Sequence, residues 1–368
     1  MSETKMCNVL LVGCGCPLRS MGWYHAEQLL DNRCPSAKLR YVVEPWYMCE
    51  AARNTPGWSD FQTWRERIHK EYGVDFYATV DEVPDVDELR LGILSARTSD
   101  NPALFAKMVP KCSTIYLEKP GAPTVEELVQ MRDMAQTANV SVYMGFNKNV
   151  AKFSTKTMEE AESLRQQQNP HITFIHNNNY KDTELPECFE RNSEGMLKNM
   201  AIHELALLVT FFGVTVSTID KVESNATKSS CQVLKGPASG KSFTDFDKLH
   251  FTITNTSGVK VSIFADRCGG DDSVGVLTDT NNNVLKKFSM PDEYDMEQTI
   301  PKLSKKYPGA MPYFYVQDPD YCTLKERIAQ QCVNGTTPKG VATIDIAIET
   351  LKVAEYLTPI LQEQLLSS

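Results

Sequence analysis

An excess of basic residues is absent from this sequence. Its 38 lysines and arginines face 47 aspartates and glutamates, which gives a formal net charge of −9 over 368 residues. A protein that binds nucleic acid by neutralising phosphates normally carries the opposite charge, at least locally. No run of Lys and Arg supplies that charge. We therefore expect no nucleic-acid partner.

A long apolar run is also absent. None approaches the roughly 18–20 residues that a membrane-spanning helix requires. The first residues, MSETKMC, are polar and lead directly into an apolar segment, which is not the pattern of a secretory signal peptide. We expect a cytoplasmic protein with no membrane partner.

Paired cysteine spacing is the third absence. The eleven cysteines are odd in number and scattered, whereas a disulfide framework is typical of short secreted chains. Cys14 and Cys16 form a C-x-C pair, and no second pair completes a zinc site. We interpret most of the cysteines as small buried apolar residues in a reducing cytosol, and we predict no metal site.

Short apolar runs alternate with amphipathic helical patterns in the first part of the chain. This alternation is typical of βαβ units, whose parallel strands are buried on both faces. Right-handed crossovers then give a doubly wound Rossmann domain, which we place at residues 6–146. The expected strands are residues 8–12, 39–43, 89–94, 114–117 and 140–144.

The segment between Glu44 and Tyr77 is longer than this alternation requires. It carries a charged helical pattern at residues 61–72, with Trp58 and Trp64 placed to pack it down. An amphipathic helix at the domain edge is the simpler interpretation, and a lid or contact surface is the alternative.

The rest of the chain, residues 147–368, has a different pattern. Short alternating segments separated by turn residues predict a mostly antiparallel, open sheet in an α+β second domain. A helix is expected at residues 195–212, and a surface loop at residues 229–248, which are rich in Ser, Lys, Gly and Asp. The last helix can pack back on the first domain. The expected strands are 172–175, 249–255, 259–265, 274–277 and 284–288, and the closing helices are 321–333 and 343–364.

A glycine-rich turn follows the first apolar run. Gly13 and Gly15 lie where a parallel sheet binds a dinucleotide, because glycines permit a tight turn and a close approach of backbone to pyrophosphate. The next glycine, Gly22, comes seven residues after Gly15, where the G-x-G-x-x-G spacing has three. Residues 16–21 therefore form an insertion. The motif by itself leaves a plain strand-to-helix turn as the alternative.

An acidic residue, Glu44, ends the second apolar run. A carboxylate at that point accepts hydrogen bonds from the adenosine ribose hydroxyls and repels a 2′-phosphate. No Arg directly follows it. This pattern predicts NAD as the cofactor, with NADP as the alternative. A solvated strand-end carboxylate is the simpler interpretation of Glu44 taken alone.

The tripeptide Glu118-Lys119-Pro120 ends the fourth apolar run. The carboxyl ends of strands in an open α/β sheet face the ligand crevice, so Lys119 can donate hydrogen bonds to a substrate oxygen. Glu118 can orient the lysine, and Pro120 fixes the turn. Thr124 and Glu127 then form a capping box that predicts the start of a helix.

A histidine lies in the expected helix at residues 195–212. Asn199 and His203 are four residues apart, so on a continuous helix they would share one face. A histidine at the polar mouth of a buried helix can exchange protons near neutral pH. A core histidine hydrogen-bonded to backbone is the alternative. The other histidines show no metal-ligand spacing.

Taken in order, these motifs resemble the Gfo/Idh/MocA family, the glucose–fructose oxidoreductase and inositol dehydrogenase group. The E-K-P motif is followed by Gly145-Phe146-Asn147 and then by the helix that carries His203. The resemblance covers nearly the whole chain. It implies an N-terminal Rossmann domain and a C-terminal domain that binds substrate, whose open sheet mediates a homodimer or homotetramer.

The resemblance implies a cofactor role for each matching residue of the first domain. Gly13, Gly15 and Gly22 correspond to the phosphate-loop glycines, and His25 follows Gly22 as in the G-x-x-H of the family. Glu44 corresponds to the ribose-binding acid.

The resemblance also implies the catalytic residues. Lys119, with Glu118 and Pro120 beside it, matches the lysine that contacts substrate and the nicotinamide ribose. His203 matches the histidine that gives or takes the substrate proton. Asn199 stands where many members have Asp; it can hydrogen-bond substrate but carries no charge.

We therefore predict an NAD(P)-dependent oxidoreductase of a sugar, polyol or related polar small molecule. Asn179, Tyr180 and Lys181 follow the first strand of the second domain and are predicted to contact the substrate. Lys181 and Arg191 could instead hold a carboxylate, which leaves a reductase of a keto acid or an amino-acid-derived imine as an alternative. A non-catalytic nucleotide-binding regulatory protein of the same fold is the other alternative, favoured by Asn199 and the altered glycine turn.

Overall fold

The computed structural model describes residues 5–85, 88–165 and 168–366. The chain divides into two compact units. The first comprises the chain up to Asn147 together with Met296–Ala347, and the second comprises Lys148–Asp295 together with the chain from Ile348 onward. The predicted division after residue 146 placed the segment 296–347 in the second domain, whereas here that segment belongs to the first unit.

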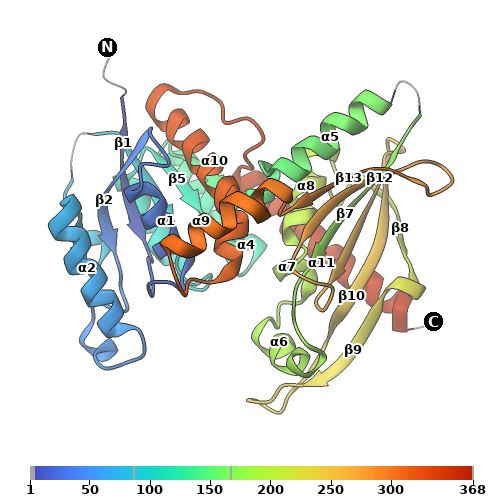
Figure 1. The fold of residues 1–368 in the computed structure, drawn as a ribbon, viewed down its shortest axis with the longest axis horizontal. Helices are drawn as coiled ribbons and strands as arrows, with labels where there is room; N and C mark the ends of the chain where they lie inside the picture. The colour runs from blue at the N-terminus through green and yellow to red at the C-terminus, as the bar shows by residue number, and fades with distance from the viewer. Residues whose placement is uncertain (1–4, 86–87, 166–167, 367–368) are drawn as a thin grey trace. The chain divides into compact units, whose positions relative to one another are not determined.

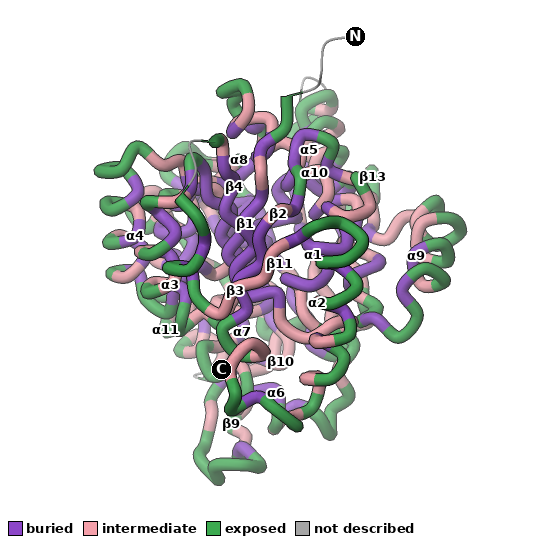
Figure 2. Tube along the Cα trace, turned by 90° about the vertical axis from the view of Figure 1, so that its left-hand side faces the viewer, coloured by how far each residue is buried: buried purple, intermediate pink, exposed green. Residues whose placement is uncertain are grey.

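The first unit is built on a six-stranded parallel sheet, of which Figure 1 labels β1, β2 and β5. Its strand order is β3-β2-β1-β4-β5-β6. This is the order of a classical dinucleotide-binding fold. Figure 2 shows the central strands β1, β2 and β4 as buried, in agreement with their continuous apolar sequences. The strands are β1 Cys7–Val12, β2 Ala37–Val43, β3 Asp75–Tyr77, β4 Arg90–Leu94, β5 Thr114–Leu117 and β6 Ser141–Met144.

Helices from both segments of the first unit pack on this sheet. Helix α1 and helix α10 contact each other and β1. The predicted capping box starts α4, since Thr124 Oγ1 accepts the Glu127 N–H at 3.2 Å. In α2, Trp64 is buried and donates its indole N–H to Glu27 at 2.7 Å. The helices are α1 Met21–Leu30, α2 Trp58–Tyr72, α3 Asn101–Met108, α4 Val125–Thr137, α9 Ile300–Lys306 and α10 Pro312–Asn334.

The second unit is built on a seven-stranded sheet with the order β13-β12-β7-β11-β10-β8, and β9 pairs with β10. Only the β7–β11 pairing is parallel among the pairings of its described strands. The predicted class, a Rossmann domain followed by an α+β domain with a mostly antiparallel sheet, is confirmed. The strands are β7 His171–Asn177, β8 Ile219–Ser224, β9 Ser230–Lys235, β10 Ser242–Asn255, β11 Lys260–Asp266, β12 Ser273–Thr278 and β13 Val284–Met290.

Helix α5 lies against β12 and β13 of this sheet. A Cβ atom on Gly275 would lie 1.9 Å from Thr157 Oγ1, so the helix can approach the sheet closely only because β12 has a glycine there. The helices of the second unit include α5 Lys152–Leu164, α6 Leu185–Arg191, α7 Met196–Asn199 and α8 Ile202–Phe212, and α11 spans Ile344–Leu366.

The prediction of a surface loop at residues 229–248 is wrong. Most of that segment forms β9 and the first half of β10, paired antiparallel. The turn residues that suggested a loop are concentrated at 236–241, where Gly236 and Gly240 close a hairpin turn by a 2.9 Å hydrogen bond. Phe246 and Leu249 of β10 are buried, so packing that the local composition does not reveal favours a long strand.

The eleven cysteines are all free thiols. Within the described ranges, no helix has the length and apolar character needed to cross a membrane. The same residues contain no group of three or more His, Cys, Asp or Glu side chains that could hold a metal ion.

Candidate active site

The glycine turn after β1 is closely packed. Gly13 and Gly15 have φ angles of +81° and +68°, which favour glycine. A Cβ atom on Gly13 would lie 2.8 Å from the backbone of Ala96, and one on Gly22 would lie 2.2 Å from the carbonyl oxygen of Gly13. The predicted glycines thus let the turn meet both the chain after β4 and the start of α1.

The inserted residues 16–21 form a turn that leads directly into α1. Ser20 Oγ accepts the N–H of Cys16 at 2.9 Å, and the Ser20 N–H donates to the Cys16 carbonyl at 3.0 Å. The carbonyl of Leu18 accepts the Met311 N–H at 3.1 Å, which ties the turn to the start of α10. The insertion therefore leaves Gly22 in the first turn of α1, whose N–H groups have no intrahelical acceptors and suit a phosphate.

Glu44 at the end of β2 is nearly buried, with 4% of its surface exposed. Its Oε2 accepts the Gly15 N–H at 2.7 Å, and its Oε1 accepts the N–H groups of Trp46 and Tyr47 at 3.2 and 3.4 Å. The carboxylate thus holds the glycine turn in place. Each carboxylate oxygen has two lone pairs, so Glu44 retains acceptor capacity for a ribose hydroxyl.

Glu118 of the E-K-P motif lies at the centre of a buried hydrogen-bond network. Its Oε1 accepts the hydroxyl of Tyr116 at 2.5 Å and contacts Nε2 of His25 at 2.8 Å. Burial by itself would raise the pKa of Glu118, but the bonds from His25 and Tyr116 and the charge of Lys119 outweigh it, and the pKa is lowered. An ionised carboxylate therefore sits beside Lys119, which is itself partly exposed.

A second lysine, Lys325 of α10, completes this network. Its ammonium contacts Nδ1 of His25 at 3.0 Å and Oε1 of Gln28 at 2.5 Å. Burial, and then the charge of Lys325, lowers the pKa of His25 to about 4. His25 is consequently neutral at pH 7, accepts at Nδ1 and donates from Nε2 to Glu118. The sequence contains no local signal for Lys325, which lies 300 positions from His25.

The helix that carries His203 is interrupted, which corrects the expectation of one helix over residues 195–212. α7 ends at Asn199 and α8 begins at Ile202. The N–H of Ala201 bonds to the carbonyl of Met196, five residues back, at 3.0 Å, so the regular helical ladder stops there. Asn199 and His203 therefore lie on separate helices, and the Asn199 side chain donates to Glu194 at 2.9 Å.

Next to His203 in the chain is a fully buried carboxylate, Glu204. Its Oε1 accepts the ammonium of Lys148 at 2.7 Å, and its Oε2 contacts Nδ1 of His176 at 3.0 Å. Burial would raise the pKa of Glu204, but the charges of His176, Lys148 and His203 lower it below the ordinary range. These four residues form what we call the Glu204 cluster.

His203 itself is 6% exposed, and its ring centroid lies 6.5 Å from that of His176. A negative charge thus lies near His203 although Asn199 is uncharged, because Glu204 supplies it. No sequence motif singled out Lys148, His176 or Glu204 as site residues. For two of them the position in the sequence was a usable signal. Lys148 directly follows the Gly145-Phe146-Asn147 motif, and Glu204 directly follows His203.

The other predicted substrate residues lie in the chain after β7. Asn179 and Lys181 are exposed, and the backbone N–H of Lys181 donates to Glu184 at 2.8 Å. The hydroxyl of Tyr180 accepts a guanidinium N–H of Arg191 at 2.9 Å. The exposed positions of Asn179 and Lys181 contrast with the burial of the Glu204 cluster.

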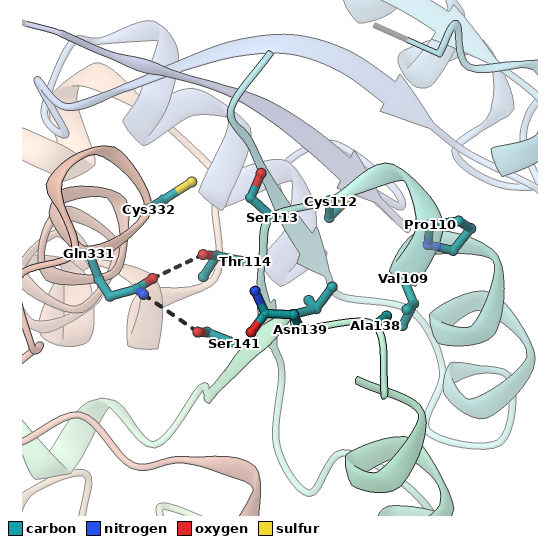
Figure 3. A pocket seen from close by; sticks show the side chains of 11 residues that line it. Val109, Pro110, Cys112, Ser113, Thr114, Ala138, Asn139, Ser141, Gln331 and Cys332 are labelled. Carbon is teal, nitrogen blue, oxygen red and sulfur yellow. Dashed lines mark hydrogen bonds between the residues drawn. The ribbon is translucent and has the colours of Figure 1, made fainter. Parts of the chain in front are cut away.

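A separate cavity of about 540 Å³ lies at the amino ends of β5 and β6, at the sheet edge opposite the glycine turn (Figure 3). Neutral polar groups and two thiols line much of it. Gln331 accepts from Thr114 at 2.9 Å and donates to Ser141 at 3.5 Å there. Ligands of parallel α/β sheets bind at the carboxyl ends of the strands, so this cavity is not part of the candidate site.

No protein-family model and no curated protein sequence matches this chain. Solved structures match over nearly its full length. The scyllo-inositol dehydrogenase from Lactobacillus casei with bound NAD(H) and scyllo-inositol has a TM-score of 0.68 and 15% identity, covering 99% of this chain and 98% of its own. The myo-inositol 2-dehydrogenase from Lactobacillus plantarum has a TM-score of 0.67 and 15% identity, covering 99% and 98%.

A third solved structure also shares the fold of this chain. GenD2 from gentamicin A biosynthesis, in complex with NAD, has a TM-score of 0.67 and 16% identity, covering 96% of this chain and 94% of its own. At these identities the comparisons establish a shared fold. The predicted architecture, a Rossmann domain followed by an α+β domain, is thereby confirmed as a fold that these dehydrogenase structures share.

Proposed function

We propose that this protein is an NAD-dependent oxidoreductase of a sugar, polyol or related polar small molecule. The observation that carries the proposal is a closely packed glycine turn in the same unit as Lys119 of the E-K-P motif, which lies beside the ionised Glu118. The second unit adds His203 beside the buried ion pair of Lys148 and Glu204. The inositol dehydrogenase folds described above support the same function, and one of those structures holds NAD(H) and scyllo-inositol.

NAD fits the residues of the first unit. The positive φ angles and tight contacts of the glycine turn leave no room for side chains there, and the start of α1 offers N–H groups to a pyrophosphate. We propose that Gly13, Gly15 and Gly22 form this phosphate site and that Glu44 binds the adenosine ribose. Glu118 and Pro120 would position Lys119 at the nicotinamide end.

In the proposed mechanism the protein transfers the substrate proton and donates a hydrogen bond to the substrate oxygen. Bound NAD supplies the hydride chemistry. His203 takes the proton of the substrate hydroxyl in oxidation or returns it in reduction. Lys119 donates a hydrogen bond to the same oxygen and stabilises its developing charge. Glu204 keeps negative charge near His203 and so favours the imidazolium that proton transfer creates.

The second unit is proposed to bind the substrate and to mediate a homo-oligomer. Asn199, Asn179, Tyr180 and Lys181 are the proposed substrate contacts outside the Glu204 cluster. The partly exposed side chains of Ile175 and Phe264 are neighbours in register on the sheet, and we propose that a second copy of the chain packs on this half-exposed face.

An absorbance assay tests the proposed function. The protein is mixed with NAD and a panel of inositols, aldoses and linear polyols, or with NADH and the matching carbonyl compounds, and nicotinamide absorbance is followed. We expect turnover with at least one polyol. Binding of NADH without turnover on either panel would contradict the proposal and support the non-catalytic regulatory alternative.

The Lys119→Ala variant is expected to remain folded, because this lysine is partly exposed at a strand end. Loss of one donor to a developing oxyanion typically costs about 2.7–4 kcal/mol, so kcat/KM should fall by roughly 10²–10³-fold. Lys107→Ala, an exposed lysine on α3 of the same unit, is the control and should leave kcat/KM unchanged. Wild-type kcat/KM in a folded Lys119→Ala protein would exclude the assigned role.

Glu44 is expected to set the cofactor preference. Because its carboxylate attracts ribose hydroxyls and repels a 2′-phosphate, wild-type protein should bind NADH more tightly than NADPH. Glu44→Gln keeps the side-chain shape but removes the charge, and should reduce the preference by about tenfold, on the order of 1.4 kcal/mol. Fluorescence titration measures both dissociation constants. Tighter binding of NADPH by the wild type would instead indicate a phosphate contact in the inserted turn, with Arg19 or Ser20 as candidates.

A further inference from the structure

Helix α10 carries a buried lysine, Lys325, to which the proposed mechanism assigns no role. Lys325 has no exposed surface. Its ammonium contacts Nδ1 of His25 at 3.0 Å and Oε1 of Gln28 at 2.5 Å, and both of these residues belong to α1. Burial of an ammonium is costly unless its donors and its charge are matched nearby. Gln28 is uncharged and His25 is neutral at pH 7, so these two contacts match the donors but not the charge.

The imidazole of His25 lies between Lys325 and the carboxylate of Glu118. Its Nδ1 faces the ammonium, and its Nε2 contacts Oε1 of Glu118 at 2.8 Å. An ammonium can only donate, so Nδ1 must accept, and the single ring proton of neutral His25 lies on Nε2. Lys325 therefore selects the tautomer of His25 that donates to Glu118.

The charge of Lys325 also bears on which cation Glu118 accompanies. A protonated His25 would form an ion pair with Glu118 and would share that carboxylate with Lys119. Burial, and then the charge of Lys325, lowers the pKa of His25 to about 4, so the ring is uncharged at pH 7. The negative charge of Glu118 is then left to Lys119, whose own charge contributes to the lowered pKa of Glu118.

Three tyrosines also face the pair of His25 and Glu118. The hydroxyl of Tyr116 donates to Oε1 of Glu118 at 2.5 Å. The rings of Tyr116 and Tyr321 lie edge-on to the imidazole, with centroid distances of 5.4 and 5.3 Å. Burial raises the pKa of both hydroxyls above the ordinary value, and it raises the pKa of Tyr313 to about 12. The three tyrosines are therefore uncharged near neutral pH, and they do not replace the charge of Lys325.

We propose that Lys325 is a positioning residue of the candidate active site, which holds His25 as an uncharged Nε2–H donor and so reserves the charge of Glu118 for Lys119. Lys325 acts through His25 and Glu118 and is assigned no contact with substrate. The consequence for catalysis rests on the proposed function, because it requires Lys119 to contact the reacting oxygen. The state of His25 does not depend on that function and can be measured without cofactor or substrate.

Nitrogen NMR of the whole chain with ¹⁵N-labelled histidine tests the state of His25. The chain has six histidines, and the signals of His25 are those missing from His25→Gln. In wild type we expect the Nε2–H tautomer and no titration between about pH 5.5 and 8. In Lys325→Met the pKa of His25 should rise, because the repulsion by Lys325 is removed while the bond to Glu118 remains.

Two NMR outcomes would overturn the proposal. One is a wild-type His25 that is protonated on Nδ1 or titrates near the ordinary histidine pKa of 6.5, and this outcome decides the question even if Lys325→Met does not fold. The other is an unchanged pKa of His25 in folded Lys325→Met. Lys325→Gln separates the donor from the charge, since its amide can still donate to Nδ1. It should keep the Nε2–H tautomer and still raise the pKa of His25.

The pH dependence of kcat/KM tests the consequence for Lys119. Lys325→Met should lower kcat/KM by about tenfold at the acid end of the profile, where His25 takes up a proton and pairs with Glu118. Arg33→Met is the matched control, because it removes a cation that links α1 to Asp318 of α10 at the other end of the network. It should leave the profile unchanged. The same acid-side loss in Arg33→Met would show that loosened packing is the cause and would exclude the positioning role. Absence of turnover in the wild type would contradict the proposed function, whereas the NMR result decides the effect of Lys325 on His25 independently.

Discussion

The His203→Asn variant is expected to slow the single-turnover hydride step by about 10²–10⁴-fold, the usual contribution of a general acid or base. Asparagine keeps a hydrogen-bonding side chain of similar size but cannot exchange a proton near pH 7. Stopped-flow absorbance of the nicotinamide measures the step across a pH series. The ionisation seen in the wild-type profile should be absent from the variant.

A second histidine of the same unit provides the control for His203. His171 lies on β7, five residues before His176, and contacts Ser262 at 2.8 Å outside the Glu204 cluster. His171→Asn should leave the hydride step and its pH profile unchanged. If the wild-type ionisation persists in His203→Asn, another group moves the proton, and His176→Asn is the next variant to measure.

The charge near His203 can also be varied. Removing the negative charge of Glu204 in Glu204→Gln should move the ionisation to lower pH, because a nearby carboxylate favours imidazolium. Asn199→Asp leaves the Lys148–Glu204 pair intact and adds a charge on α7, where the Asn199 side chain lies against Glu194. It should move the ionisation to higher pH, but by less than Glu204→Gln lowers it. Shifts in the opposite directions would show that His203 is not the ionising group.

The Lys148→Met variant is expected to lose about 3–5 kcal/mol of stability, because it leaves a buried carboxylate without its cation. The side chains of Lys148 and Glu204 are 1% and 0% exposed. Denaturant unfolding followed by circular dichroism measures the change. The chain has two units, so the transition of the second unit must be resolved from that of the first before a free energy is assigned.

Lys152 of α5 is the matched control for Lys148. It pairs with Asp292, but its side chain is 52% exposed, and exposed pairs contribute about 0–1 kcal/mol. Lys152→Met should therefore cost far less than Lys148→Met. Equal losses in the two variants would show that the buried pair adds nothing beyond a surface pair.

The pH dependence of the Lys148→Met effect follows from the lowered pKa of Glu204. The stability that its ionised form provides is present above the ordinary glutamate pKa of 4.5 and is lost as pH falls toward the lower folded value. A protonated Glu204 carries no charge, so the loss of the Lys148 charge no longer destabilises the fold through it. The difference between wild type and Lys148→Met should consequently narrow below about pH 4.5, and a constant difference would contradict the pairing.

The local sequence determined those strands and turns that are encoded by a few consecutive residues. Continuous apolar runs predict buried parallel strands because both faces of such a sheet are covered, and β1, β2, β4, β5 and β6 lie within a few residues of their predicted bounds. The glycines of the turn and the capping box of α4 are also local, since each depends on backbone geometry within a few residues. Gly13, Gly15 and Gly22 are closely packed in the structure, although the insertion before Gly22 breaks the standard spacing.

Tertiary structure alone decided which polar groups meet. Lys325 reaches His25 across 300 positions, and Lys148 and His176 converge on Glu204 from different elements. The break between α7 and α8 and the strands at 229–248 likewise depend on packing that outweighs local composition. A buried charge is tolerated only where a partner from elsewhere in the chain meets it. The sequence therefore determined that an E-K-P lysine and a helix histidine exist here. The fold determined which charged side chains surround each of the two.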